Sequence, residues 1–354
     1  MTHARRPTAP RTIALLAALS LPAALGACTD AGYPAPGPTS SKARTTGTPS
    51  ATSAAAPTTT APASAEAPQQ AAEIAAKAMT AAVAAVAAPG PEGKAAREAA
   101  FTGSALAAAN AQNALLGALT AAEKDNPVLS DADPAVLTVS QGPAYPRAIL
   151  VKTTRRASGF PLVTLLVAAD AQQGYRVAGW ATLLPGATLT GFAELESGSV
   201  FLTSAAEVGP SIEGTLADYA ASLAYPPPAA VEHAFVEDSY AATVRQAAKA
   251  QADALGSAGS VSQQHEPQGV LGAFRLPGEQ GSVVLIRMDR KDVLQEKTAN
   301  AFTPTKKFTA LSGKTLIDTQ ATQQTVEYLL VRFPVTGKAV VLGAAEQLYA
   351  ASGS

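Results

Sequence analysis

The chain contains a single cysteine, Cys28, among its 354 residues. A disulfide within the chain needs two cysteines, so none can form, and a structural zinc site built from several cysteines is excluded as well. The fold must therefore be held by packing alone. Alanine dominates the apolar residues and only 5% of the chain is aromatic. At about 25 cal/mol per Å² of buried apolar surface, such a core stabilises modestly per residue, which favours helices packed close to sheets.

The first 27 residues have the pattern of an export signal. Arginines and no acidic residue precede an apolar run over residues 13–25. A run of roughly 13 residues is too short to cross a bilayer, which takes ~20, but it is typical of a signal peptide. No later run is long and apolar enough to span a membrane.

The end of this run, Leu25-Gly26-Ala27-Cys28, resembles the lipobox of bacterial lipoprotein signals. The resemblance implies cleavage after Ala27 and a diacylglyceryl thioether on Cys28. Two acyl chains give stable anchoring, so the protein is expected on the extracytoplasmic face of the cell membrane, with the membrane as its partner through Cys28. The alternative is an ordinary signal peptide followed by an incidental cysteine. The export route, Sec or twin-arginine, stays open.

Residues 28–68 consist mostly of Thr, Ser, Ala, Pro and Gly. This composition cannot form an amphipathic face, and it predicts a disordered stalk. As a flexible coil, about forty residues span roughly 35 Å. The stalk would hold the folded part away from the membrane.

The folded part shows the same order of elements twice. The first half predicts helices over 71–88 and 94–123, and strands over 136–140, 147–154, 162–169 and 175–184. The second half predicts helices over 212–224 and 229–255, and strands over 270–275, 282–288, 326–333 and 339–343.

The register of the two halves favours a duplication. At a shift of 134 residues, Ile149-Leu150-Val151 lies over Val283-Val284-Leu285, and at a shift of 164 Leu165-Leu166-Val167 lies over Leu329-Leu330-Val331. The second copy thus carries an insertion near 290–320 with a mild basic excess. The units are expected at 69–207 and 208–354. The alternative is coincidence in an alanine-rich chain.

The predicted fold class is α+β, with two tandem helix-helix-antiparallel-sheet units, each cone-like, after the disordered linker. In its element order this is similar to the nuclear transport factor-like or cystatin-like architecture. The chain also resembles uncharacterised actinobacterial lipoproteins that have a lipobox signal and a Pro/Thr/Ala-rich stalk. That likeness implies no activity.

The search for chemistry is mostly negative. The sequence holds no Ser-x-x-Lys, no Gly-x-Ser-x-Gly and no His-Glu-x-x-His motif. A formal net charge of -1 argues against nucleic-acid binding. Asp131 and Asp133 are too few oxygen ligands for a typical calcium site and favour a turn. Neither a metal nor a cofactor is expected.

The candidate pocket residues are His233, Trp180 and Tyr175. His233 falls on the predicted helix 229–255, where an inward-facing side chain could line a cavity or simply pack. Trp180 and Tyr175 lie five apart on one predicted strand and hence on opposite faces, so one is expected in the core. His265-Glu266, just before Pro267, favours a solvated loop pair over a catalytic base.

These observations favour a non-catalytic lipoprotein that binds an envelope protein, a wall polymer or an apolar ligand. One alternative is a small hydrolase or isomerase using the cavity of the second unit, with His233 or His265 as base. Another is a passive spacer or assembly factor.

Overall fold

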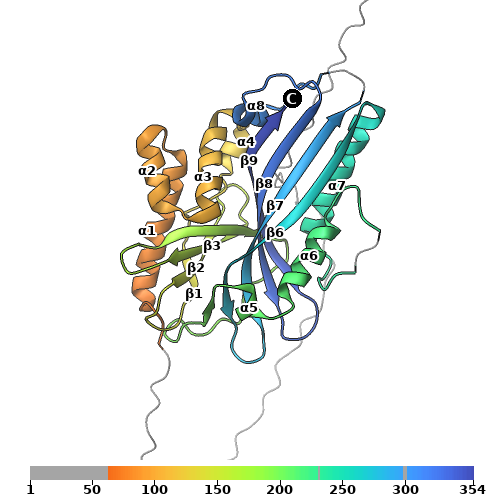
Figure 1. Cartoon of the computed structure of the whole chain (residues 1–354). Helices are drawn as coiled ribbons and strands as arrows, with labels where there is room; N and C mark the ends of the chain where they lie inside the picture. Colours follow the sequence, from red (N-terminus) through yellow and green to blue (C-terminus); the bar gives the residue numbers. More distant parts are fainter. Residues whose placement is uncertain (1–62, 230–231, 298–300) are drawn as a thin grey trace, which may run out of the picture.

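The computed structural model describes residues 63–229, 232–297 and 301–354. The predicted signal peptide, Cys28 and residues 28–62 of the predicted stalk lie outside these residues. The described part is a mixed helix and sheet fold with one curled antiparallel sheet (Figure 1).

The first half begins with three helices, α1 (Pro68–Ala87), α2 (Gly90–Ala100) and α3 (Gly103–Leu115), and a short helix α4 (Ala121–Asp125). Alanine is the best helix former, Pro68 occupies the first turn of α1, and Pro89 precedes α2. Four strands follow: β1 (Ala135–Val139), β2 (Arg147–Thr154), β3 (Pro161–Ala168) and β4 (Arg176–Leu183). These strands agree with the predicted ones to within two residues.

The second half opens with the short strand β5 (Phe201–Leu202) and the helices α5 (Ala205–Val208), α6 (Ile212–Ser222) and α7 (Ser239–Leu255). Long strands follow, interrupted by one short helix: β6 (Gly259–Arg275), β7 (Ser282–Glu296), α8 (Lys306–Ser312), β8 (Gln320–Phe333) and β9 (Val340–Gly353).

Within the described residues the strands pair in the order β1-β2-β3-β4-β9-β8-β7-β6-β5. In each half, strands that follow one another in the chain pair side by side, and the two runs meet where β4 pairs with β9. That junction consists of two residue pairs, Thr182 with Ala344 and Leu183 with Gly343. The order of elements recurs in the two halves, but their strands belong to one sheet. The two tandem cone-like units and their common origin stay predictions.

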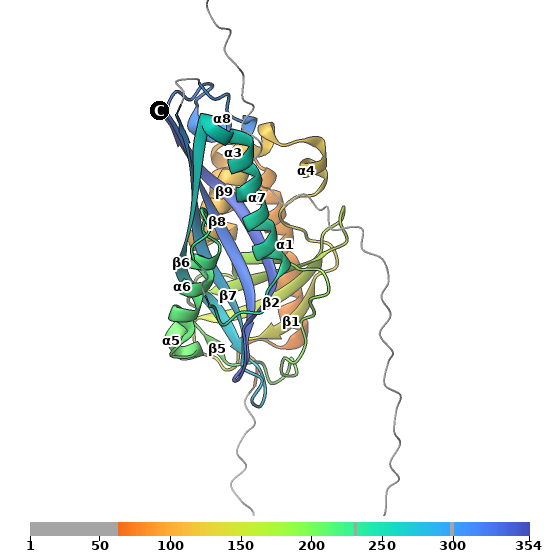
Figure 2. The same cartoon turned by 90° about the vertical axis from the view of Figure 1, so that its right-hand side faces the viewer.

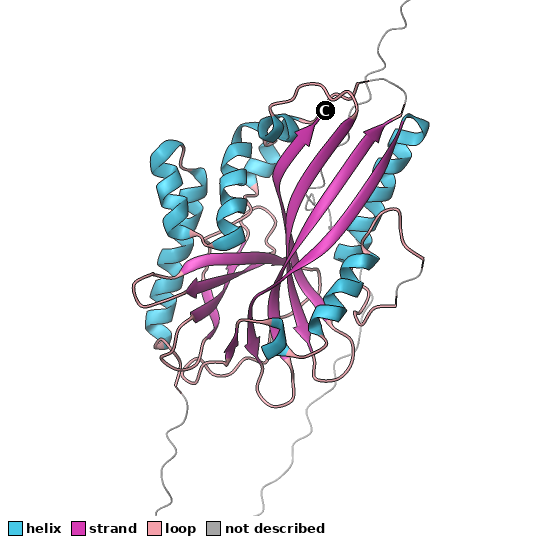
Figure 3. Ribbon diagram, in the orientation of Figure 1, coloured by secondary structure: helices cyan, strands magenta, loops and turns pink. Residues whose placement is uncertain are grey.

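Helices cover both faces of the second-half sheet (Figures 2 and 3). On one face, α3 is joined to β8 by a hydrogen bond from the hydroxyl of Tyr328 to that of Ser104. On the other face, α7 is joined to β9 by a bond from Tyr240 to Glu346. Glu327, which neighbours Tyr328 on β8, pairs with Glu346, so successive residues of β8 point to opposite helices.

Several predicted elements need correction. The helix predicted over 94–123 breaks at Phe101 and Thr102, because Phe101 is extended and bridges Val177 of β4. The helix predicted over 229–255 begins only at Ser239, because the carboxylate of Asp238 accepts a hydrogen bond from the amide of Ala241 and so caps it there. The predicted insertion is largely an extension of β7 and β8 beyond their expected ends, with α8 between them.

The last residues of the predicted stalk are ordered against the sheet. The amide of Ala65 donates to the carbonyl of Ser140, and Glu66 is 8% exposed. The Glu66 carboxylate accepts hydrogen bonds from Arg147 at 3.1 Å and from the Tyr175 hydroxyl at 3.1 Å. The folded part therefore begins before residue 69.

Candidate functional site

A band of polar and charged side chains crosses the sheet beneath α6 and α7. It lies between two apolar clusters, one containing Ile286, Met288 and Leu329, and the other containing Leu294 and Ala321. Strands β6 to β9 and α7 supply what we call the buried polar network, which consists of Tyr240, Gln263, His265, Arg290, Asp292, Glu327 and Glu346. The sheet register places His265 opposite Arg290 and Glu327 opposite Glu346.

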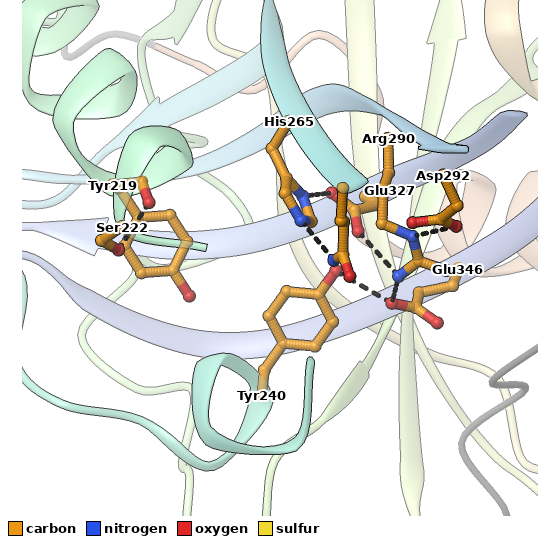
Figure 4. Close-up of polar contacts among 9 residues, drawn as sticks. Tyr219, Ser222, Tyr240, His265, Arg290, Asp292, Glu327 and Glu346 are labelled. Atoms are coloured by element: carbon orange, nitrogen blue, oxygen red, sulfur yellow. Dashed lines mark hydrogen bonds and ion pairs between the residues drawn. The ribbon is translucent and has the colours of Figure 1, made fainter. Parts of the chain in front are cut away.

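Arg290 is the centre of the network (Figure 4). Its Nη1 donates to Glu346 Oε1 at 2.6 Å and to Glu327 Oε1 at 3.2 Å, and its Nε donates to Asp292 Oδ2 at 3.1 Å. The Arg290 side chain is 4% exposed, that of Glu327 0% and that of Glu346 5%. One guanidinium thus faces three buried carboxylates.

His265 completes the network on the β6 side. Its Nδ1 lies 2.8 Å from Glu327 Oε2, and its Nε2 lies 2.6 Å from the side-chain amide of Gln263. The imidazole is fully buried. Because both ring nitrogens are engaged and water has no access to them, this histidine cannot take a proton from an external substrate in this arrangement.

The environment pushes the pKa values of two glutamates in opposite directions. Burial opposes ionisation of Glu327, but His265 and Arg290 outweigh it and hold the pKa of this carboxyl below its ordinary value. For Glu346, burial and the neighbouring Glu327 outweigh Arg290 and raise the pKa. Glu346 Oε2 is buried without a hydrogen-bond partner among the described residues, which fits a carboxyl whose charged form is disfavoured.

The other face of the same strands carries an open hollow of about 490 Å³, which we call the β6–β9 hollow. Its sheet lining consists of Gln264, Glu266, Asp289, Lys291, Gln324 and Tyr349, and alanines of the C-terminal end of α6 border it. His265 and Arg290 also touch this hollow, but their side chains are buried in the network, so their main chain faces it. Side chains alternate between the faces of a strand, and the sheet therefore separates the hollow from the buried network.

The prediction for His265-Glu266 is wrong in its local structure. Both residues lie on β6, and the His265 side chain is buried rather than solvated. Glu266 is exposed on the opposite face and lines the β6–β9 hollow. The two side chains therefore do not form a His–carboxylate pair, and the carboxylate that His265 contacts belongs to Glu327.

His233 lies ahead of α7 rather than on it, and it lines a second open hollow, of about 610 Å³. Its Nε2 is 3.6 Å from Glu237 Oε1, and its Nδ1 accepts a hydrogen bond from the amide of Phe235 at 3.3 Å. The ring stands edge-on to Tyr219 at a centroid distance of 6.0 Å. The side chain is 10% exposed, and Glu237 also pairs with Arg245 at 3.0 Å.

The two aromatic candidates have packing roles. Trp180 on β4 is 2% exposed and lies between Phe101 and Tyr328, which is the predicted core position. Tyr175 precedes β4 and bonds to Glu66, and burial together with that carboxylate raises its pKa. Neither residue lines one of the two hollows described above.

The described part of the chain holds no group of three or more His, Cys, Asp or Glu side chains placed to bind a metal ion. Asp131 pairs with Arg156 at 3.4 Å, and Asp133 has a left-handed backbone with φ of 53°. Both observations fit the predicted turn. None of the described helices combines the length and the apolarity needed to cross a bilayer.

Sequence reasoning missed the buried polar network as a unit. Arg290 and Asp292 fall in the predicted insertion near 290–320, and no sequence pattern marks Glu327 or Glu346. A signal for them exists in the spacing: Arg290 and Asp292 are two apart, as are Gln263 and His265, which is the period of side chains on one face of a strand.

No protein-family model, curated protein or solved structure matches this chain.

Proposed function

We propose that the protein is an exported, lipid-anchored accessory protein of the cell envelope that binds a partner rather than transforming a substrate. The lipobox at Cys28 supports the anchor. The hydrogen bonding and burial of His233 and His265 are the observation that supports binding without substrate turnover. His265 is fully buried with both nitrogens engaged, and His233 has one nitrogen on the amide of Phe235 and the other facing Glu237.

A binding role also fits the distribution of polar groups. The charged groups with shifted pKa values in the buried polar network are turned away from the surface, where they fix α7 to the sheet. The β6–β9 hollow, on the opposite face, offers polar side chains, among which burial and the neighbouring Asp289 raise the pKa of Tyr349. Sites with catalytic groups usually show the reverse, with perturbed groups in the cleft.

One observation favours a second candidate, a hydrolase or isomerase with His233 as base. His233 lies in a hollow beside Glu237, as such a reaction requires. Its Nδ1 lone pair is used by the Phe235 amide, so Nε2 would have to act while Glu237 moved to another position.

Two measurements test the proposal. Mass spectrometry of the membrane fraction is expected to find a processed N-terminus with lipid on Cys28, and an intact, unmodified Cys28 would contradict the anchor. The purified chain carrying Cys28→Ser is expected to leave ester and wall-glycan substrates unchanged. Turnover that His233→Ala abolishes, and that His265→Asn leaves in place, would replace the binding role with the second candidate.

A further inference from the structure

The β6–β9 hollow presents hydrogen-bonding groups that the fold itself does not use. Across the described residues, the side chains of Gln264, Glu266, Lys291 and Gln324 make no hydrogen bond or ion pair. The nearby Asp289 is different, because Arg287 holds its carboxylate by two bonds of 3.0 and 2.7 Å. The two free amides each offer two donors and one acceptor oxygen toward the hollow.

The charges around the hollow balance. Glu266 and Asp289 are matched by Lys291 and Arg287, so the site carries no net charge that would favour an anionic polymer or a cation. No large aliphatic side chain lines it: apart from the ring of Tyr349, its apolar wall consists of small alanines at the end of α6, so it does not form the deep apolar cavity that a lipid requires.

An extended peptide pairing with β6 is also disfavoured. The stretch of β6 between Gln263 and Ala273 has its outer edge free of strand partners among the described residues, since Tyr225 bridges Gln263 and β5 pairs from Ala273 onward. Pro267 lacks an N–H in this stretch, and the β6 register shifts between Pro267 and Gly269 and again between Val270 and Gly272. Proline and bulges are the features by which edge strands avoid further pairing.

We propose that the β6–β9 hollow binds an uncharged, polyhydroxylated ligand, namely a neutral oligosaccharide segment of an envelope glycan. The proposal rests on the binding role inferred above and names its ligand class. The amides of Gln264 and Gln324 can each donate to one hydroxyl and accept from another. The Tyr349 ring, which is packed in part against the core, and the alanine methyls of α6 can contact the C–H faces of the sugar rings.

The test uses the full chain with Cys28→Ser, titrated by calorimetry with neutral hexasaccharides of the gluco, manno, galacto and N-acetylglucosamine types. Polyphosphate and lauric acid serve as the anionic and the apolar probe. A neutral hexasaccharide is expected to bind, and Gln264→Ala and Gln324→Ala are each expected to weaken binding by about tenfold or more, because each variant loses one donated and one accepted hydrogen bond. Gln268→Ala is the matched control, an exposed glutamine of β6 outside the hollow, and it should bind as the parent chain does.

Three results would overturn the proposal: no neutral hexasaccharide binds, polyphosphate or lauric acid binds in its place, or neither glutamine variant loses affinity. Each of these results can be distinguished from a failure of the proposed function. A protein that captures polyphosphate is still a binding protein with another ligand class, whereas the proposed function fails only through turnover at His233 or the absence of the lipid. Because both glutamine side chains are without intramolecular bonds, their loss should not alter the melting temperature, which is checked for every variant.

Discussion

Arg290 is the residue whose removal should reveal the energetics of the buried polar network. In Arg290→Met the side chain keeps much of its volume but loses its charge, and Glu327, Glu346 and Asp292 then lie buried without the cation they share. Removing one partner of a buried ion pair costs about 3–5 kcal/mol. Folded domains are stable by only about 5–15 kcal/mol, so this variant should lose a large part of its stability at pH 7.

The cost should depend on pH in a definite direction. Without Arg290 the remaining carboxyls hold protons more tightly in the folded state, so acidification relieves their repulsion. The destabilisation at pH 5 should be smaller than at pH 7 by about 1.4 kcal/mol for each unit by which a carboxyl pKa is raised into that interval. Urea unfolding followed by fluorescence gives both values, because Trp180 is the sole tryptophan of the chain and is buried in the core.

Arg287→Met is the matched control. Arg287 lies on the same strand, three residues away on the opposite face, and pairs with a single carboxylate while its side chain is 32% exposed. Such a pair contributes about 0–1 kcal/mol. The network does not stabilise the fold through its charges if Arg290→Met lowers the free energy of unfolding no more than Arg287→Met does, or if the loss is the same at pH 5 and pH 7.

Further predictions concern other parts of the fold. Glu327 has a lowered pKa, so its contribution to folding stability is present above about pH 4.3 and is lost as the pH falls through the folded pKa. Glu346 has a raised pKa, so its contribution to folding stability is lost as the pH rises above about 4.3. In Glu346→Gln, the urea midpoint of unfolding should therefore no longer decrease as the pH rises above about 4.3. Gly281→Ala should be far more destabilising than Gly278→Ala, because both have positive φ but only the Gly281 methyl would meet a backbone oxygen, at 1.9 Å; equal melting temperatures would contradict the hairpin geometry. Trp180→Ala should lower the free energy of unfolding by about 3–5 kcal/mol. Urea unfolding followed by circular dichroism, or thermal unfolding, measures this loss, and a value below 1 kcal/mol would contradict the core position of Trp180.

The first-half strands could be predicted because their sequence obeys the simple rules. They are rich in β-branched and apolar residues and are bounded by turn residues, so propensity and burial agree. In the second half the same rules failed where the network lies. Polar residues there occupy covered positions that a hydrophobic pattern assigns to solvent, so the pattern predicts strands that stop short of Gln263, His265, Arg290 and Asp292.

The prediction of the site residues was wrong for a related reason. The alanine-rich stretch from residue 229 predicts a helix that includes His233, whereas the cap at Asp238 sets the helix start at Ser239, ten residues later. The partnership of His265 with Glu327 could not be predicted, because it joins residues 62 apart in the chain through a strand pairing that only the three-dimensional register defines.

The junction of β4 and β9 has a consequence for the integrity of the chain. Across a cut near residue 209 the sheet is joined by two residue pairs of β4 with β9 and two of β5 with β6. The core beneath is also continuous, since Trp180 packs on Tyr328 at a centroid distance of 5.1 Å. Each half completes its own hairpins locally but leaves an apolar face that only the other half covers. The molecule therefore has the construction of a split protein: two pieces cut apart near residue 209 would each be incomplete, and each would carry the surface that recognises the other.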